Sequence, residues 1–137
     1  MVRPGTTLTR AEEVIYLAGV TDGEGCFGYD SGSVRFTVTN TYRPMCERFR
    51  AAFGGQVRQL KGKDNEPGHR TQFSWRASGE EARAAMREML PYLDEKAAQA
   101  KLLLLMWDLR KVPGSTNKLN AELKRLKRID YGTDSTN

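Results

Sequence analysis

The sequence has few of the residues that hold metals or form covalent crosslinks. It contains two cysteines, Cys26 and Cys46, and a single histidine, His69. Two cysteines are too few for a disulfide scaffold and match no metal-ligand spacing, so we expect a reducing intracellular compartment. One histidine excludes zinc sites that need a His pair and leaves little basis for His-assisted nucleophilic catalysis. His69 stands in a polar stretch with glycine and proline, which favours an ordinary surface position.

Long apolar runs are also missing. The longest, residues 102–107, is far shorter than the roughly 18 residues that a membrane span requires. The first ten residues lack the apolar segment of a secretory signal. We therefore expect neither secretion nor a membrane partner.

What remains is typical of one globular domain with a basic surface. The 137 residues are 28% charged and 39% hydrophobic, which suits a single domain over 1–137, with residues 1–8 and 131–137 expected to be flexible. Lys and Arg number 22 against 17 Asp and Glu, a net charge of +5. This excess favours a polyanionic partner such as nucleic acid.

The hydrophobic period switches repeatedly between helix and strand along the chain. Thr9 and Glu12 form a capping box at the first helix, and Ser78 and Glu81 form a second one. The expected elements are a helix to about residue 22, strands 26–30 and 33–39, a helix 44–53, strands 56–61 and 71–77, a helix ending at 90, a long helix 93–111, and a last helix spanning the apolar stripe 119–129. The polar connection 62–70 is expected to be mobile. This order predicts an α+β fold, with one antiparallel sheet covered by helices on one face.

The uncovered sheet face is expected to be polar and basic. The strand residues predicted to line it are Arg35, Thr37, Arg58, Ser74 and Arg76. Arginine and hydroxyl side chains suit the edges of bases and phosphate oxygens. The alternative is an ordinary solvated sheet face. Lysines and arginines on the last helix offer further phosphate contacts.

The stretch YLAGVTDGEGCF, residues 16–27, raises a question of charge. It places Asp22 and Glu24 where the first helix should end. A helix C-terminus carries partial negative charge, so each acid there is disfavoured by a few tenths to about 1 kcal/mol. Without further context, Asp22 to Gly25 could be a simple helix stop followed by a turn.

Residues 17–25, LAGVTDGEG, resemble the signature of the LAGLIDADG homing endonucleases. The likeness extends to VTN at 38–40, where the second strand is expected to end, and to LPYLDEKAAQAKLLL at 90–104. The order of expected elements is similar to the αββαββα core of that family, which is followed by C-terminal helices. The resemblance therefore implies this fold for most of the chain.

The same resemblance implies a metal-dependent site. It assigns Glu24 as the ligand of Mg²⁺, for which Mn²⁺ can substitute, with the backbone carbonyl of Gly23 beside it. It places Lys96 near the scissile phosphate and Asn40 where a polar residue organises water. The metal would then offset the acids at the helix end. Where some members carry a basic residue this chain has Pro44, which leaves the role of the adjacent Arg43 open.

The resemblance also implies a symmetric homodimer that binds double-stranded DNA. Two first helices would pack together at a two-fold axis through Leu17, Ala18, Gly19 and Thr21. The implied activity is site-specific cleavage of both strands of a long pseudo-palindromic target, encoded in an intron or a free-standing gene. Two alternatives stay open: an intron-splicing maturase that binds RNA, and a non-catalytic DNA-binding regulator.

Overall fold

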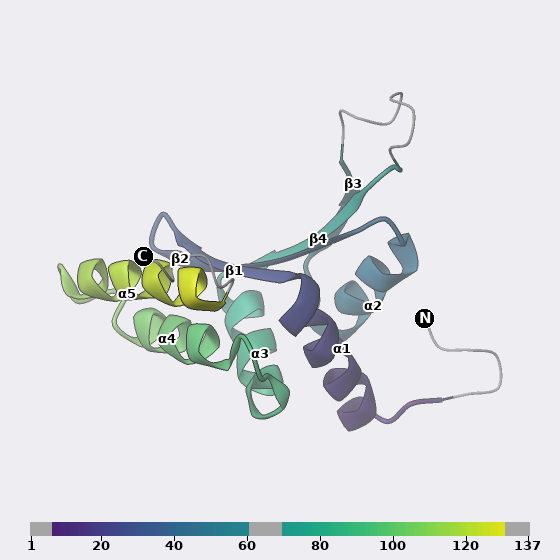
Figure 1. Cartoon of the computed structure of the whole chain (residues 1–137), viewed down its shortest axis with the longest axis horizontal. Helices are drawn as coiled ribbons and strands as arrows, with labels where there is room; N and C mark the ends of the chain where they lie inside the picture. Colours follow the sequence, from purple (N-terminus) through teal and green to yellow (C-terminus); the bar gives the residue numbers. More distant parts are fainter. Residues whose placement is uncertain (1–6, 61–69, 131–137) are drawn as a thin grey trace.

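The computed structural model describes residues 7–60 and 70–130, which form an α+β unit as predicted (Figure 1). The elements are α1 (Arg10–Glu24), β1 (Gly25–Asp30), β2 (Ser33–Asn40), α2 (Arg43–Phe53), β3 (Gln56–Gln59), β4 (Phe73–Ser78), α3 (Glu80–Met89), the 3₁₀ turn η1 (Leu90–Tyr92), α4 (Ala97–Asp108) and α5 (Ser115–Asp130). The expected αββαββα order is confirmed. Residues 1–6 of the predicted flexible end 1–8 and the predicted flexible end 131–137 lie outside the described residues. So do His69 and residues 62–69 of the predicted mobile connection.

The four strands form one antiparallel sheet in the order β1-β2-β4-β3. The tight turn between β1 and β2 has positive φ at Ser31 and at Gly32, the conformation that two-residue hairpins require. The register pairs Phe27 with Phe36 and Phe36 with Ala77. Alternate residues therefore project to the same side, and the apolar set forms one continuous face under the helices.

An aromatic cluster fills the space between the sheet and α2. Phe36 packs edge-to-face on Phe27 at 4.9 Å and on Trp75 at 4.8 Å, while Phe49 of α2 lies 5.0 Å from Trp75. Such ring pairs contribute roughly 0.5–1.5 kcal/mol each beyond their burial. The indole N–H of Trp75 donates to the carbonyl of Gly54 at 2.7 Å, so the end of α2 is fixed on the sheet.

The start of α3 differs from the prediction. Ser78 is the last residue of β4, where it pairs with Arg35, and the helix N-cap is Gly79 with no side-chain capping bond. The N–H of Gly79 donates to the carbonyl of Val34 at 3.0 Å. The Ser78 capping box was therefore wrong, because pairing with β2 extends the strand through the residue that would have capped the helix.

The long helix predicted from residue 93 also begins later, at Ala97. The N–H groups of Asp94 and Lys96 donate to the side chain of Asp22 in α1. These tertiary bonds hold residues 94–96 in a turn instead of a helix. α5 packs beside α4, and its Lys127 ammonium donates to the carbonyl of Phe27 on the edge strand β1. None of the helices in residues 7–60 and 70–130 combines the length and the apolar character that a membrane span needs.

Candidate catalytic site and nucleic-acid interface

The first helix runs two residues further than predicted and ends in an acidic tip. Asp22, Gly23 and Glu24 are its last residues, with no basic side chain in the final turn. Gly25 then begins β1, and its N–H donates to the carbonyl of Thr21. A Cβ at Gly25 would lie 2.8 Å from that carbonyl oxygen, so only glycine fits where the helix turns into the sheet. The tip therefore lies where β1 begins, beside the end of β2.

The Glu24 carboxylate is exposed and contacts the end of β2. The side-chain amide of Asn40 donates to Glu24 Oε1 at 2.6 Å, and the backbone N–H of Tyr42 donates to Asn40 Oδ1 at 2.8 Å. The second bond fixes the amide so that its NH₂ group faces the carboxylate. The structure therefore brings together two residues that lie sixteen positions apart in sequence and that the sequence analysis had assigned to one site.

Asp22 points to the other side of the tip, toward the start of α4. Its two carboxylate oxygens accept hydrogen bonds from the backbone of Asp94 at 2.9 Å and of Lys96 at 3.0 Å. The Lys96 ammonium, on a residue only 2% exposed, donates back to the Asp22 carbonyl at 2.9 Å. The acid thus lies near the positive start of α4 and the lysine at the negative end of α1, both favourable placements. For Asp22, the compensation that was expected from a metal comes from the protein itself.

The tip offers oxygen ligands for one divalent cation but not a complete site. Across residues 7–60 and 70–130, no three His, Cys, Asp or Glu side chains gather into a metal-binding group. Glu24 and Gly23 are both exposed. Mg²⁺ is commonly held by one or two carboxylates and keeps several waters. The donor chemistry of Glu24 and the Gly23 carbonyl fits such an ion.

The predicted polar sheet face exists, although its members differ in accessibility. The register places Thr37 beside Arg76, and Ser74 beside Arg58. Arg58 and Arg76 are exposed, whereas Ser74 is only 7% exposed. Arg35 is half-buried and forms an ion pair with Asp30. Arg58 and Arg76 are therefore the two predicted arginines on this face with the most accessible side chains.

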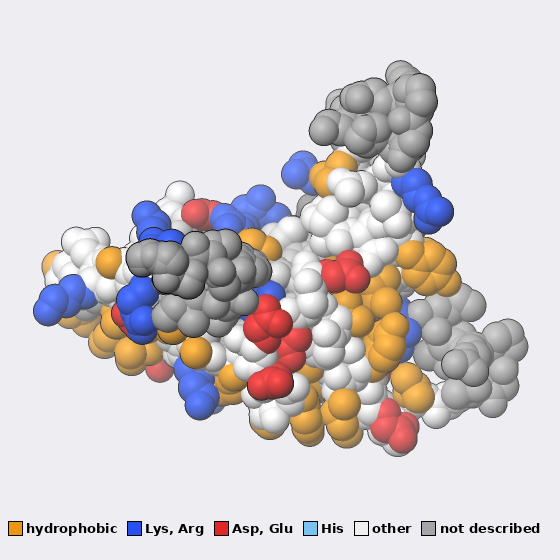
Figure 2. Space-filling model, viewed as in Figure 1, with side chains coloured by type: hydrophobic (Ala, Val, Ile, Leu, Met, Phe, Trp, Pro, Cys, Tyr) orange, Lys and Arg blue, Asp and Glu red, His pale blue; other side chains and the backbone are white. Residues whose placement is uncertain are grey.

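A hollow lies along β3 and β4 on this side of the sheet. It measures about 450 Å³, and Gln56, Arg58, Ser74 and Arg76 contribute to its lining. Gln56, which pairs with Arg76, and Thr39, which pairs with Ser74, belong to the same face and were missed. Thr39 could have been found from its alternation with Thr37, whereas the pattern of β3 is too weak to show Gln56. Figure 2 shows basic side chains over α5 and beside β3, with acidic side chains gathered between them.

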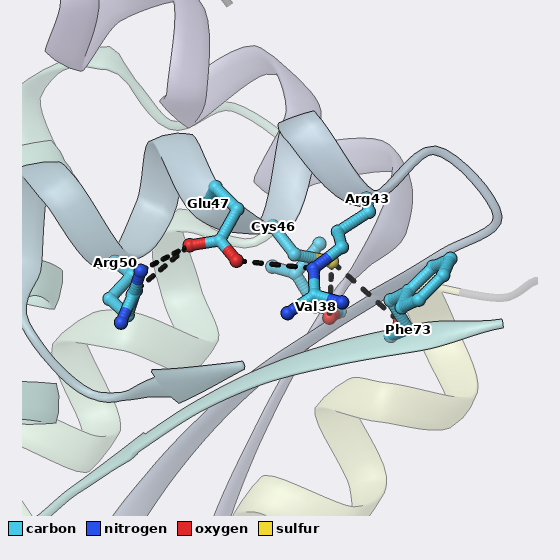
Figure 3. Close-up of polar contacts among 6 residues, drawn as sticks. All are labelled: Val38, Arg43, Cys46, Glu47, Arg50 and Phe73. Carbon is cyan, nitrogen blue, oxygen red and sulfur yellow. Dashed lines mark hydrogen bonds and ion pairs between the residues drawn. The ribbon is translucent and has the colours of Figure 1, made fainter. Parts of the chain in front are cut away.

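Arg43 begins α2 close to the end of β2 (Figure 3). Its guanidinium lies over the ring of Phe73, 5.4 Å from the centroid, and Phe73 is the strand partner of Asn40. Glu47 accepts hydrogen bonds from both Arg43 and Arg50, at 3.2 and 2.9 Å. Beneath them burial raises the pKa of the Cys46 thiol, so this cysteine is an uncharged packing residue. Arg43 is thus held near the candidate site with its charge partly balanced.

The predicted interface residues of α1 need correction. Leu17, Ala18 and Thr21 have no exposed surface and pack inside their own chain, so they cannot contact a second copy. The reason is that the first helix is covered on this side by the sheet and by α3. Gly19 is exposed with nothing within 4 Å of an added Cβ, and Ile15 and Tyr16 are 48% and 44% exposed. The outward face of α1 is defined by Ile15, Tyr16 and Gly19.

Comparison with solved structures shows the fold. The crystal structure of the homing endonuclease I-CvuI, in complex with its target Sro1.3 in the presence of 2 mM Ca, superposes with a TM-score of 0.64 at 21% identity, covering 85% of this chain and 83% of that one. A second I-CvuI structure, in complex with the I-CreI target C1221 in the presence of 2 mM Mg with the DNA not cleaved, gives 0.61 at 22% identity, covering 93% and 85%. No family model and no curated protein sequence matches the chain. The predicted LAGLIDADG homing-endonuclease fold is confirmed.

Proposed function

We propose that this protein is a site-specific endonuclease of double-stranded DNA that requires a divalent cation, Mg²⁺ or Mn²⁺. The observation that carries the proposal is the Glu24–Asn40 pair, an exposed carboxylate oriented by an amide at the acidic end of α1. The basic, hydroxyl-bearing sheet face supports a nucleic-acid partner. The structures of I-CvuI, which have this fold, contain target DNA.

Each residue of the candidate site has a separate task in this proposal. Glu24 and the Gly23 carbonyl hold the cation, which when bound would polarise the phosphate and favour deprotonation of a water. Asn40 keeps the carboxylate in position through its bond to Oε1. Lys96 fixes the end of α1, and direct contact with the phosphate would require its ammonium to leave the Asp22 carbonyl. Arg58 and Arg76 contact bases or phosphates, together with Arg35, Thr37 and Ser74.

Cleavage of both strands requires a second copy of the chain in this proposal. One chain carries one acidic tip, and the two strands present two phosphodiester bonds of opposite polarity. The outward face of α1 has open space at Gly19, which allows a second α1 to approach closely. A homodimer then predicts a pseudo-palindromic target. A protein that stays monomeric at micromolar concentration, with and without target DNA, would contradict this arrangement.

The decisive experiment combines target selection with a charge-neutral substitution. Selection from a randomised duplex library for Mg²⁺-dependent cutting yields the target, on which Glu24→Gln is then compared with wild type. We expect E24Q to bind the target within about threefold of wild type and to cleave it at least 100-fold more slowly, the order of loss when a key electrostatic group is removed. Asp108→Asn removes one negative charge at the end of α4 and serves as the matched control.

Binding assays on the wild-type protein, together with the E24Q comparison, separate the alternatives. Sequence-specific binding without cleavage by wild type would indicate a DNA-binding regulator. Stronger binding to a folded intron RNA than to duplex DNA in competition would indicate a maturase. Unchanged cleavage by E24Q would contradict the assignment of the site.

A further inference from the structure

An arginine of α2 reaches the outward face of α1 and lies over its exposed tyrosine ring. The guanidinium carbon of Arg48 is 4.2 Å from the centre of the Tyr16 ring. A guanidinium over an aromatic face is attracted by the ring quadrupole, also at an exposed site. Tyr16 is still 44% exposed, so one side of its ring is covered by Arg48 while the remainder faces outward beside Gly19.

Arg48 is itself held in one geometry. Its Nε and Nη2 donate to the two oxygens of Glu13 on α1 at 2.9 and 2.7 Å. The side chains of Arg48 and Glu13 are only 12% and 18% exposed. A bidentate, largely buried pair restricts both partners far more than an exposed one does. Arg48 is therefore held in place by Glu13, which lies one turn before Tyr16 on α1.

A shallow hollow continues this surface from α1 onto α2. It has a volume of about 400 Å³ and is lined by Arg43, Pro44, Glu47, Arg48 and Ala51. The outward face of α1 and this hollow meet at Arg48. The surface offered to an approaching helix therefore includes an aromatic projection at Tyr16, open space at Gly19 and a hollow beside Arg48.

We propose that Arg48 is a positioning residue for the docking of a second copy, because it fixes Tyr16 before the two chains meet. This inference rests on the homodimer proposed above and names a residue that its formation depends on. An aromatic side chain that is already ordered does not lose conformational freedom on association, whereas a free one does and weakens the complex accordingly. Glu13 acts indirectly, by holding Arg48.

The test compares two lysine substitutions in the dimerisation equilibrium. Arg48→Lys keeps the charge and can still pair with Glu13, but it loses the planar stack on Tyr16. Arg10→Lys is the matched control, because Arg10 also forms a bidentate pair between α1 and another helix, with Glu88 at 2.9 and 2.7 Å. We expect R48K to raise the dimer dissociation constant about fivefold, measured by sedimentation equilibrium, and R10K to change it less than twofold.

A double-mutant cycle adds a readout that a general loss of stability would not move. In a Tyr16→Ala background, R48K is expected to cause no further weakening of the dimer, because the side chain that it positions is gone. Equal effects of R48K and R10K, or additive effects of R48K and Y16A, would overturn the inference. If R48K fails to fold, Glu13→Gln with Glu88→Gln as its control carries the same comparison.

The wild-type measurement distinguishes this inference from the proposal on which it rests. A wild-type chain that never dimerises overturns both the homodimer and the role of Arg48. A wild-type dimer that R48K leaves unchanged overturns only the role of Arg48.

Discussion

The two sides of the acidic end of α1 contain similar side chains in opposite situations. On the side facing α4, Asp22 is half-buried and both of its carboxylate oxygens accept backbone hydrogen bonds. On the side facing β2, Glu24 is exposed and is oriented by a side-chain amide from Asn40. The two acids are two residues apart, yet one is part of the framework and the other is accessible to a ligand.

The difference shows how a helix end can keep an exposed acid without losing its stability. The Asp22 carboxylate of α1 lies at the start of α4, and the Lys96 ammonium lies at the end of α1. Each charge is therefore where the helix dipole favours it. These hydrogen bonds anchor the tip of α1 to the start of α4. Glu24 can then remain exposed, since the position of the helix end does not depend on it.

The largest effect on stability is expected from removing the framework acid. Asp22→Ala leaves two backbone donors without their acceptor beside the buried Lys96, and we expect a loss of about 2–3 kcal/mol in the free energy of unfolding, the usual range for hydrogen bonds to a charged group. Glu24→Ala, two residues away on an exposed side chain, should change it by less than about 0.5 kcal/mol. Urea unfolding of both variants measures the contrast. Equal losses would mean that the two sides of the tip are not distinct.

A smaller effect, on metal dependence instead of folding, is expected at Asn40. Asn40→Ala removes the donor that orients Glu24 and is expected to weaken the apparent affinity for Mg²⁺ in cleavage by about 10–100-fold, as substitutions next to metal ligands commonly do. Asn117→Ala is the control, because it removes the same amide side chain from an exposed position on α5 outside the candidate site. A Mg²⁺ titration that is the same for N40A and wild type would show that Asn40 does not serve the carboxylate.

Local sequence patterns predicted most elements of the fold, and the family resemblance predicted the exposed side of the helix end, with Glu24 and Asn40. The Thr9 capping box, the alternation in β1 and β2, and the glycines after α2 act over a few residues, so they could be read directly. Glu24 and Asn40 were assigned through the family resemblance. The contact between them confirms their proximity, whereas their catalytic role remains a prediction.

What the sequence could not show depends on contacts between distant segments. Ser78 had the spacing of a helix cap, but pairing with β2 extends β4 through it. Residues 94–96 had a helical pattern, but Asp22 accepts hydrogen bonds from their backbone N–H groups. Leu17 and Ala18 were assigned to an interface through the family resemblance, and they pack in the core of their own chain. In each case the sequence was compatible with two structures, and contacts with a distant segment of the chain selected the one that had not been predicted.

The smallest expected effect is at the opposite end of α1, where acids are paired with arginines instead of backbone groups. The hydrogen bonds from Arg48 lower the pKa of Glu13, and those from Arg10 lower the pKa of Glu88. The folded-state pKa of each acid is therefore below its unfolded value, taken as 4.5. Between the folded and the unfolded pKa the unfolded chain binds more protons than the folded one. The stabilisation by each pair is therefore fully present above the unfolded pKa and is lost as the pH falls through the folded pKa.

Glu13→Gln should flatten the decline of unfolding free energy between about pH 5 and pH 3, measured by urea titration at each pH. Glu88→Gln should flatten it less, because the Arg10–Glu88 pair is 53% and 39% exposed against 12% and 18% for Arg48 and Glu13. Identical pH profiles for the two variants would show that burial does not set the strength of these ion pairs. The start of α1 would then lack the contrast between a buried and an exposed acid that Asp22 and Glu24 show at its other end.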